Sequence, residues 1–146
     1  GLAGLRVGYA ICHERIASYF LKIKQPYNVN VAGEAAAIAS LEDADYLLAN
    51  VAKLKRERDR MYEALQVMPF MSPHPSQANF LLCRVADKAP AGDETAAKRV
   101  HDGLRRRGIL VRFYETPDLR DCIRISAGLP DDTDTLLSAL EEVWNE

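Results

Sequence analysis

Three short apolar stretches decide the fold: Asn79-Phe-Leu-Leu-Cys-Arg-Val85, Ile109-Leu-Val-Arg-Phe-Tyr114 and Cys122-Ile-Arg-Ile-Ser126. Each has the length of a strand, and the last one alternates between apolar and polar positions. Helical patterns surround them, over residues 32–41, 43–66, 93–107 and from Pro130 onward. This order of elements predicts an α/β protein of the α+β type, in which helices pack on one face of a small, partly antiparallel sheet.

Local signals place the ends of these elements. Gly108 stands where a left-handed helix C-cap is expected, and Pro130 suits the first position of the last helix. We predict a loop over residues 87–92 and a proline-rich connector over residues 68–75. The apolar stripe of the helix over 43–66 is interrupted by Arg58; its members are Leu47, Val51, Leu54, Met61 and Leu65.

The start of the chain has a different character. Residues 5–12 are apolar and predict a buried strand, and residues 13–24 predict a helix. We therefore expect two parts, with residues 1–28 belonging to another, larger domain and residues 29–146 forming the small α+β domain.

Composition excludes several classes of function. The chain has 146 residues, of which 48% are hydrophobic and 27% charged, as in an ordinary globular protein. Its formal net charge of −2 gives no overall field that would attract nucleic acid or a membrane surface. The basic run over residues 105–107 suits the C-terminal end of a helix and is interpreted as a solvated helix end.

The cysteines indicate a reducing compartment. Cys12, Cys83 and Cys122 are odd in number, far apart and each in an apolar run, with no CxxC spacing for zinc. We expect buried, reduced thiols and no metal site, in a cytoplasmic protein. We expect neither a signal peptide nor a membrane span, because the sequence shows no such pattern and no apolar run of the roughly 20 residues that a span needs.

Three arginines are candidates for binding anions. Arg6 lies among glycines in Gly1-Leu-Ala-Gly-Leu-Arg-Val-Gly8, where backbone can approach a ligand and a guanidinium can bind a phosphate bidentately. Arg112 and Arg124 each interrupt an apolar strand, so each points to solvent or meets an anion, because buried arginine needs a partner. If their strands are neighbours, the two side chains could converge. Surface arginines remain the alternative for all three.

These residues belong to a series of motifs with a known counterpart. In order, they are Gly1-Leu-Ala-Gly-Leu-Arg-Val-Gly-Tyr9, Gln25-Pro-Tyr-Asn-Val-Asn30, Ser76-Gln-Ala-Asn-Phe80, Arg107-Gly-Ile-Leu-Val-Arg112 and Ile123-Arg-Ile-Ser-Ala-Gly128. The series resembles the part of fold-type I pyridoxal-phosphate (PLP) aminotransferases that follows their Schiff-base lysine. It is most similar to the C-terminal part of the histidinol-phosphate aminotransferase branch, along nearly the whole chain.

The resemblance implies a role for each candidate residue. Arg6 would bind the PLP phosphate, and residues 1–28 would be a remnant of the large PLP-binding domain. Arg124 would bind the anionic group of the substrate, and Arg112 would join it where that group is a phosphate. Asn79 and Tyr27 would line the site; a strand-end amide and a packing aromatic are their alternatives.

The implied activity is transamination between histidinol phosphate and 2-oxoglutarate, giving glutamate, in histidine biosynthesis by a homodimer. The Schiff-base lysine is expected upstream of Gly1, so no catalytic residue is expected in this chain, which alone should be inactive. Other readings stay open: an amino-acid-phosphate decarboxylase or an aromatic aminotransferase of the same fold, a non-catalytic anion-binding or interaction domain, and a nucleic-acid module resting on residues 105–107.

Overall fold

The computed structural model describes residues 2–86 and 95–146. The chain divides into two compact units, Gly1–Ala49 and Asn50–Glu146, and the long helix α3 (Ala44–Gln66) contains the point of division. The loop expected over residues 87–92, and the first two positions of the helix expected to follow it, lie outside the described residues.

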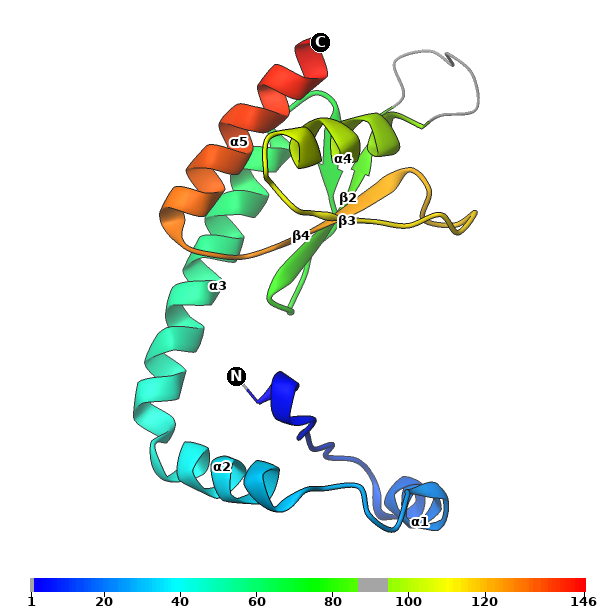
Figure 1. Ribbon diagram of the computed structural model, residues 1–146, viewed down its shortest axis with the longest axis vertical. Helices are drawn as coiled ribbons and strands as arrows, with labels where there is room; N and C mark the ends of the chain where they lie inside the picture. The colour runs from blue at the N-terminus through cyan, green and yellow to red at the C-terminus, as the bar shows by residue number, and fades with distance from the viewer. Residues whose placement is uncertain (1, 87–94) are drawn as a thin grey trace. The chain divides into compact units, whose positions relative to one another are not determined.

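The second unit contains a four-stranded sheet with the spatial order β1-β2-β4-β3 (Figure 1). Its strands are β1 (Met71–Pro73), β2 (Phe80–Val85), β3 (Arg112–Phe113) and β4 (Cys122–Ser126), and every neighbouring pair is antiparallel. Helices α4 (Ala96–Arg106) and α5 (Pro130–Asn145) complete the unit. The predicted α+β architecture is therefore confirmed.

Two strands differ from the prediction. The stretch over residues 109–114 forms only the two-residue strand β3, because the Ile109 amide donates to Leu104 O (3.0 Å) in the cap that ends α4. The connector over residues 68–75 contains β1, which the sequence analysis missed. Pro73 is tolerated because β1 is an edge strand. On the side of β1 that faces no other strand, a missing backbone N–H costs no hydrogen bond of the sheet.

Helices cover one face of this sheet. Alternate strand residues, including Leu81, Cys83 and Ile123, are almost fully buried on that face. The helices contribute the rest of the core: Met61, Leu65, Val100, Leu104, Leu136 and Leu140. Only the C-terminal part of the apolar stripe on α3 enters this core; Val51 and Leu54 are exposed. The other face of the sheet carries the alternate residues, among them the strand arginines.

The predicted helix ends of this unit are confirmed. Gly108 has φ 77° and follows α4 in the left-handed region, where glycine carries no Cβ penalty. Pro130 is the first residue of α5, and the Asp132 carboxylate accepts from the Leu129 amide at 3.0 Å. This bond satisfies one of the free donors at the start of the helix.

The first unit consists of a short 3₁₀ helix, η1 (Ala3–Leu5), and helices α1 (Glu14–Ile23) and α2 (Val31–Glu42). The prediction of a buried strand over residues 5–12 is wrong. Leu5 is the last residue of η1, and residues 6–12 are irregular and mostly exposed. A strand needs a neighbouring strand for its backbone groups, and the described part of this unit offers none.

Cysteine burial agrees with the prediction at two of three positions. Cys83 and Cys122 are buried free thiols, whereas Cys12 is exposed because it lies in the irregular segment before α1. Burial raises the pKa of Cys83 to about 12 and that of Cys122 to about 11, so both thiols are unreactive at neutral pH. No helix in the described parts of the chain is long and apolar enough to cross a membrane.

Candidate functional site

The antiparallel ladder between β3 and β4 brings two predicted site residues together. Arg112 of β3 is the register partner of Arg124 of β4. Residues that lie directly opposite each other in such a ladder point to the same face of the sheet, with Cβ atoms about 5 Å apart. Arg112 is exposed and Arg124 half-buried. The two arginines therefore start from the same face of the sheet, on neighbouring strands.

Each of these arginines lies against an aromatic ring. The Arg124 guanidinium carbon is 5.0 Å from the centre of the Phe80 ring, and that of Arg112 is 5.6 Å from the centre of the Tyr114 ring. Contacts of this kind orient a guanidinium while leaving its edge donors available. The sequence analysis did not single out Phe80 or Tyr114 as supports for the arginines.

No carboxylate among the described residues neutralises the charges of this pair. Within residues 2–86 and 95–146, neither Arg112 nor Arg124 forms an ion pair, and the buried Arg124 Nε has no hydrogen-bond partner. A buried donor without a partner costs about 1–3 kcal/mol, and like charges placed opposite each other on a sheet repel. An anion bound beside the two arginines would reduce the repulsion between their charges.

A third arginine on the same face shows the contrast. Arg84 of β2 is exposed, and its Nη1 lies 2.8 Å from Asp121 Oδ2. Its charge is therefore balanced within the protein. Arg84 thus differs from Arg112 and Arg124, which form no ion pair with the described residues.

Asn79 lies at the start of β2, beside the end of β4. Its carbonyl accepts from the Ala127 amide at 2.9 Å, continuing the ladder in which Phe80 is paired with Ser126. Asn79 is exposed. The structure therefore places it in the same unit as the arginine pair and one residue before the ring that supports Arg124.

Arg6 and Tyr27 belong to the first unit. Arg6 follows η1 with φ 60° and ψ 33°, and it is the one non-glycine residue with positive φ among those described. The left-handed conformation costs a residue with a Cβ roughly 1–2 kcal/mol, and such strain is often found at ligand sites. Arg6 Nη1 donates to Ala3 O at 3.3 Å, and the residue is exposed. Tyr27 is 97% exposed.

Helix α2 holds the segment that carries Arg6. Asn30 is the N-cap of α2: its Oδ1 accepts from the Gly33 amide at 2.7 Å, and its Nδ2 donates to Leu5 O at 3.1 Å. A Cβ on Gly33 would come within 2.5 Å of Val7 Cγ2, so the segment packs directly on the first turn of the helix. The sequence analysis did not single out Asn30 as a support for this segment, although an asparagine directly before a helix is a recognisable N-cap signal.

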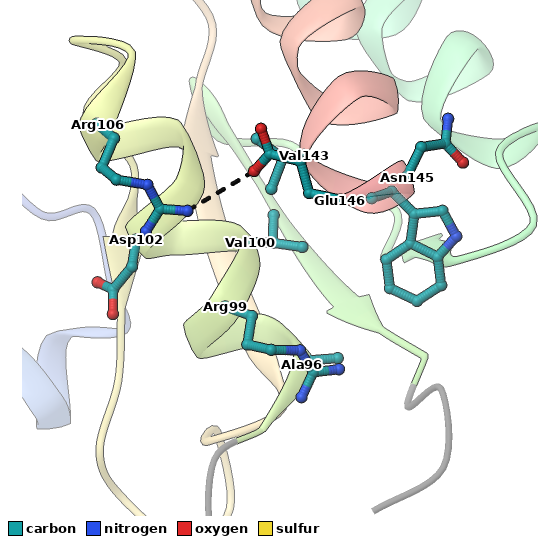
Figure 2. Close-up of a pocket in the computed structure, with 9 residues that line it drawn as sticks. Ala96, Arg99, Val100, Asp102, Arg106, Val143, Asn145 and Glu146 are labelled. Carbon is teal, nitrogen blue, oxygen red and sulfur yellow. Dashed lines mark ion pairs between the residues drawn. The ribbon is translucent and has the colours of Figure 1, made fainter. Parts of the chain in front are cut away.

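Two of the surface hollows in the second unit bear on the choice of the candidate site. One, beside β3, is lined by Arg112, Tyr114 and the residues that follow them, and by His101 of α4. The other runs along α4 beside the C-terminal end of α5, where Figure 2 shows Arg106 facing Glu146, with 3.7 Å between Nη2 and Oε2. None of the predicted site residues lines the second hollow, so the arginine pair defines the candidate site.

Comparison with known proteins identifies the region. The family described as "Aminotransferase class I and II" matches residues 1–140. The histidinol-phosphate aminotransferase of Roseiflexus castenholzii is 51% identical over 143 residues, which are 98% of this chain and 38% of the relative. The chloroplastic histidinol-phosphate aminotransferase 1 of Arabidopsis thaliana is 42% identical over 144 residues, 99% of this chain and 33% of the relative.

Solved structures match in the same way. The histidinol-phosphate aminotransferase of Sinorhizobium meliloti, in complex with pyridoxal-5'-phosphate, superposes with a TM-score of 0.77 at 34% identity, over 99% of this chain and 38% of that one. The L-threonine-O-3-phosphate decarboxylase of Porphyromonas gingivalis superposes with a TM-score of 0.74 at 23% identity, which shows the fold alone. The chain spans little more than a third of the length of the aminotransferases it matches.

Proposed function

This chain belongs to the aminotransferase class I and II family, and from that membership we propose that it is the C-terminal region of a PLP-dependent enzyme that transfers an amino group from histidinol phosphate to 2-oxoglutarate. The observation that carries the proposal is the pair formed by Arg112 and Arg124. Two guanidinium groups on one face of the sheet, without an ion pair among the described residues, match a phosphate better than a carboxylate alone.

The two arginines have different tasks in this proposal. Arg124 is held by Phe80 from the neighbouring strand and binds the anionic end of either substrate. Arg112 is more exposed and adds a second guanidinium when that end is the phosphate of histidinol phosphate. A phosphate carries up to two negative charges and three acceptor oxygens, so it can use donors from both side chains, whereas 2-oxoglutarate presents a carboxylate.

Arg6 fits the phosphate of PLP. Its left-handed backbone, fixed by the cap of η1 and by Asn30, presents a guanidinium whose one hydrogen bond to the described residues runs from Nη1 to Ala3 O. When bound, PLP supplies an electron sink for bond changes at the substrate Cα. We propose that Arg6 contributes to holding this group, and that the lysine which bonds to it is supplied by a part of the enzyme outside this chain.

This region would therefore act by orientation. Fixing the charged end of the substrate with Arg124 and Arg112 sets the direction in which its amine is presented to the cofactor, which lowers the entropy cost of reaching the reactive geometry. Loss of one desolvated guanidinium contact in such a site costs on the order of 2–5 kcal/mol. In this proposal the chain alone binds anions and does not transaminate, and the complete enzyme is a homodimer.

The test uses a hybrid enzyme, in which this chain replaces the matching segment of the Roseiflexus castenholzii relative. With histidinol phosphate and 2-oxoglutarate, we expect glutamate to form without release of CO₂. Carbon dioxide from an amino-acid phosphate would show that the same arginines serve a decarboxylase. A folded, PLP-loaded hybrid that forms neither product, beside an active unaltered relative, would contradict the proposal.

A further inference from the structure

Arg58 is a buried arginine that the proposed site does not use. It interrupts the apolar stripe of α3, and only 6% of its surface is exposed. Its Nε and Nη2 donate to Asp59 Oδ1 at 2.9 and 2.6 Å, and its Nη1 donates to the carbonyl of Ala78 at 3.3 Å. Because burying a guanidinium is costly and an apolar side chain would suit this position, the contact with Ala78 needs an explanation.

The carbonyl that Arg58 binds belongs to the segment leading into β2. The Ala78 amide donates to Ser76 Oγ at 3.0 Å, and the carbonyl of the next residue, Asn79, accepts from the Ala127 amide at 2.9 Å. The segment is thus held by three hydrogen bonds: one within the segment, one to the end of β4, and one to Arg58 of α3. These three attachments fix the backbone immediately before Phe80.

Phe80 connects this segment to the anion site. Its ring lies 5.0 Å from the Arg124 guanidinium carbon, and Phe80 and Arg124 are diagonal neighbours on the same face of the sheet. We propose that Arg58 is a positioning residue, which sets the place of Asn79 and Phe80 and, through the Phe80 ring, the direction of Arg124. This inference rests on the proposed function, because it assigns Arg58 to the binding of the substrate's anionic end.

The same helix provides a matched control. Arg60 donates to Glu57 Oε1 (2.7 Å), to Asp134 Oδ1 (2.6 Å) and to the carbonyl of Pro130 (2.9 Å). It therefore ties α3 to the start of α5, and its hydrogen bonds do not involve residues 76–80. Loss of Arg60 should reduce stability without changing the anion site.

The experiment compares R58M, R58K and R60M in the hybrid enzyme. In R58M we expect KM for both histidinol phosphate and 2-oxoglutarate to rise about tenfold, the equivalent of one hydrogen bond to a charged group, with a smaller change in kcat. R58K should raise both KM values by a smaller factor, because lysine still offers a donor to Ala78 but lacks the rigid fork. R60M should lower Tm and leave both KM values unchanged.

Several results would overturn the inference. R58M with a lower Tm but unchanged KM values would make Arg58 purely structural, as would equal KM increases in R58M and R60M. If R58M does not fold, R58K provides the test. Unchanged KM values in R58K would contradict the positioning role of Arg58, and raised KM values would support it. Absence of glutamate with the unaltered hybrid is a failure of the proposed function and is seen before any Arg58 variant is made.

Discussion

Arg112 and Arg124 are register partners across the β3–β4 ladder, and neither is ion-paired within residues 2–86 and 95–146. Two guanidinium groups placed opposite each other on one face repel. The fold keeps this arrangement although β3 is only two residues long. A ligand anion is the simplest source of the compensating charge, and this relationship yields the first two predictions.

Substitution of each arginine should affect the two substrates differently. In the hybrid enzyme, R124M should lower kcat/KM at least about tenfold for both histidinol phosphate and 2-oxoglutarate, because in the proposed function Arg124 binds the anionic end of each. R112M should lower kcat/KM for histidinol phosphate and leave the value for 2-oxoglutarate within about twofold. Steady-state kinetics with each substrate varied in turn makes the measurement. Equal effects of R112M on both substrates would contradict the division of roles.

The isolated chain should be stabilised by phosphate. A ligand that binds only the folded state raises its stability by RT ln(1 + [L]/Kd), so Tm should rise with added inorganic phosphate. The rise should be absent in R124M and retained in R84M, whose charge is already balanced by Asp121 on the same face of the sheet. Thermal unfolding against chloride at equal ionic strength controls for screening. An equal loss of the effect in both variants would indicate general surface charge.

Asn30 offers a test of how the Arg6 segment is held. N30D keeps the acceptor for the Gly33 amide but loses the Nδ2 donor to Leu5 O, whereas N30A loses both. We expect both variants to weaken PLP binding by the hybrid enzyme, and only N30A to lose in addition about 1 kcal/mol of helix-cap stability. PLP titration followed by absorbance and urea unfolding provide the two measurements. Unchanged PLP affinity in N30D would show that the hydrogen bond from Asn30 to Leu5 O does not help to position Arg6.

Sequence patterns predicted most helices and strands of the second unit, because these elements are marked by residues within or directly beside them. Strict alternation gave β4 with its observed ends, and Gly108 and Pro130 marked helix ends through φ preferences alone. The prediction failed where the outcome depends on distant partners. Whether residues 68–75 form an edge strand depends on pairing with β2, and residues 5–12 lack a described strand to pair with.

The residue types of the candidate site could be read from the sequence, but their arrangement could be predicted only in part. Arginines inside apolar strands indicated anion binding, but their juxtaposition depends on the β3–β4 register, which no local pattern specifies. The sequence showed Arg58 as an interruption of an apolar stripe and Phe80 as part of a motif, but it did not predict that Arg58 donates to Ala78 O or that the Phe80 ring lies against Arg124. The roles assigned to Arg6, Asn79, Tyr27, Arg112 and Arg124 all stay predictions; the structure shows only that Arg112 and Arg124 are register partners.

Gly103 should be required for the packing of α4 on α5. A Cβ at this position would overlap the methyl groups of Val143, with Cγ2 only 2.9 Å away. Replacing glycine inside a helix by alanine gains up to about 1 kcal/mol in propensity, while overpacking a core costs typically about 1–3 kcal/mol. We therefore expect G103A to be destabilised and the double variant G103A/V143A to recover part of the loss, as measured by urea unfolding. A G103A variant more stable than the wild type would show that the two helices separate easily.

Glu57 should contribute to the acid sensitivity of the fold. It is 8% exposed, and hydrogen bonds from Arg60, chiefly, lower the pKa of its carboxyl from the ordinary 4.5. Because the folded state favours the carboxylate, the stability that this group adds is complete above pH 4.5 and is lost as the pH falls through the lowered pKa.

The E57Q variant removes this titration. Measured by urea unfolding from about pH 7 to about pH 3, its free energy of unfolding should be lower than that of the wild type at neutral pH and should decline less steeply in acid. E63Q is the matched control, because Glu63 is exposed on the same helix and has no ion pair among the described residues; it should follow the wild type throughout. Parallel acid profiles for E57Q and the wild type would mean that Arg60 binds Glu57 no more strongly in the folded chain than in the unfolded one.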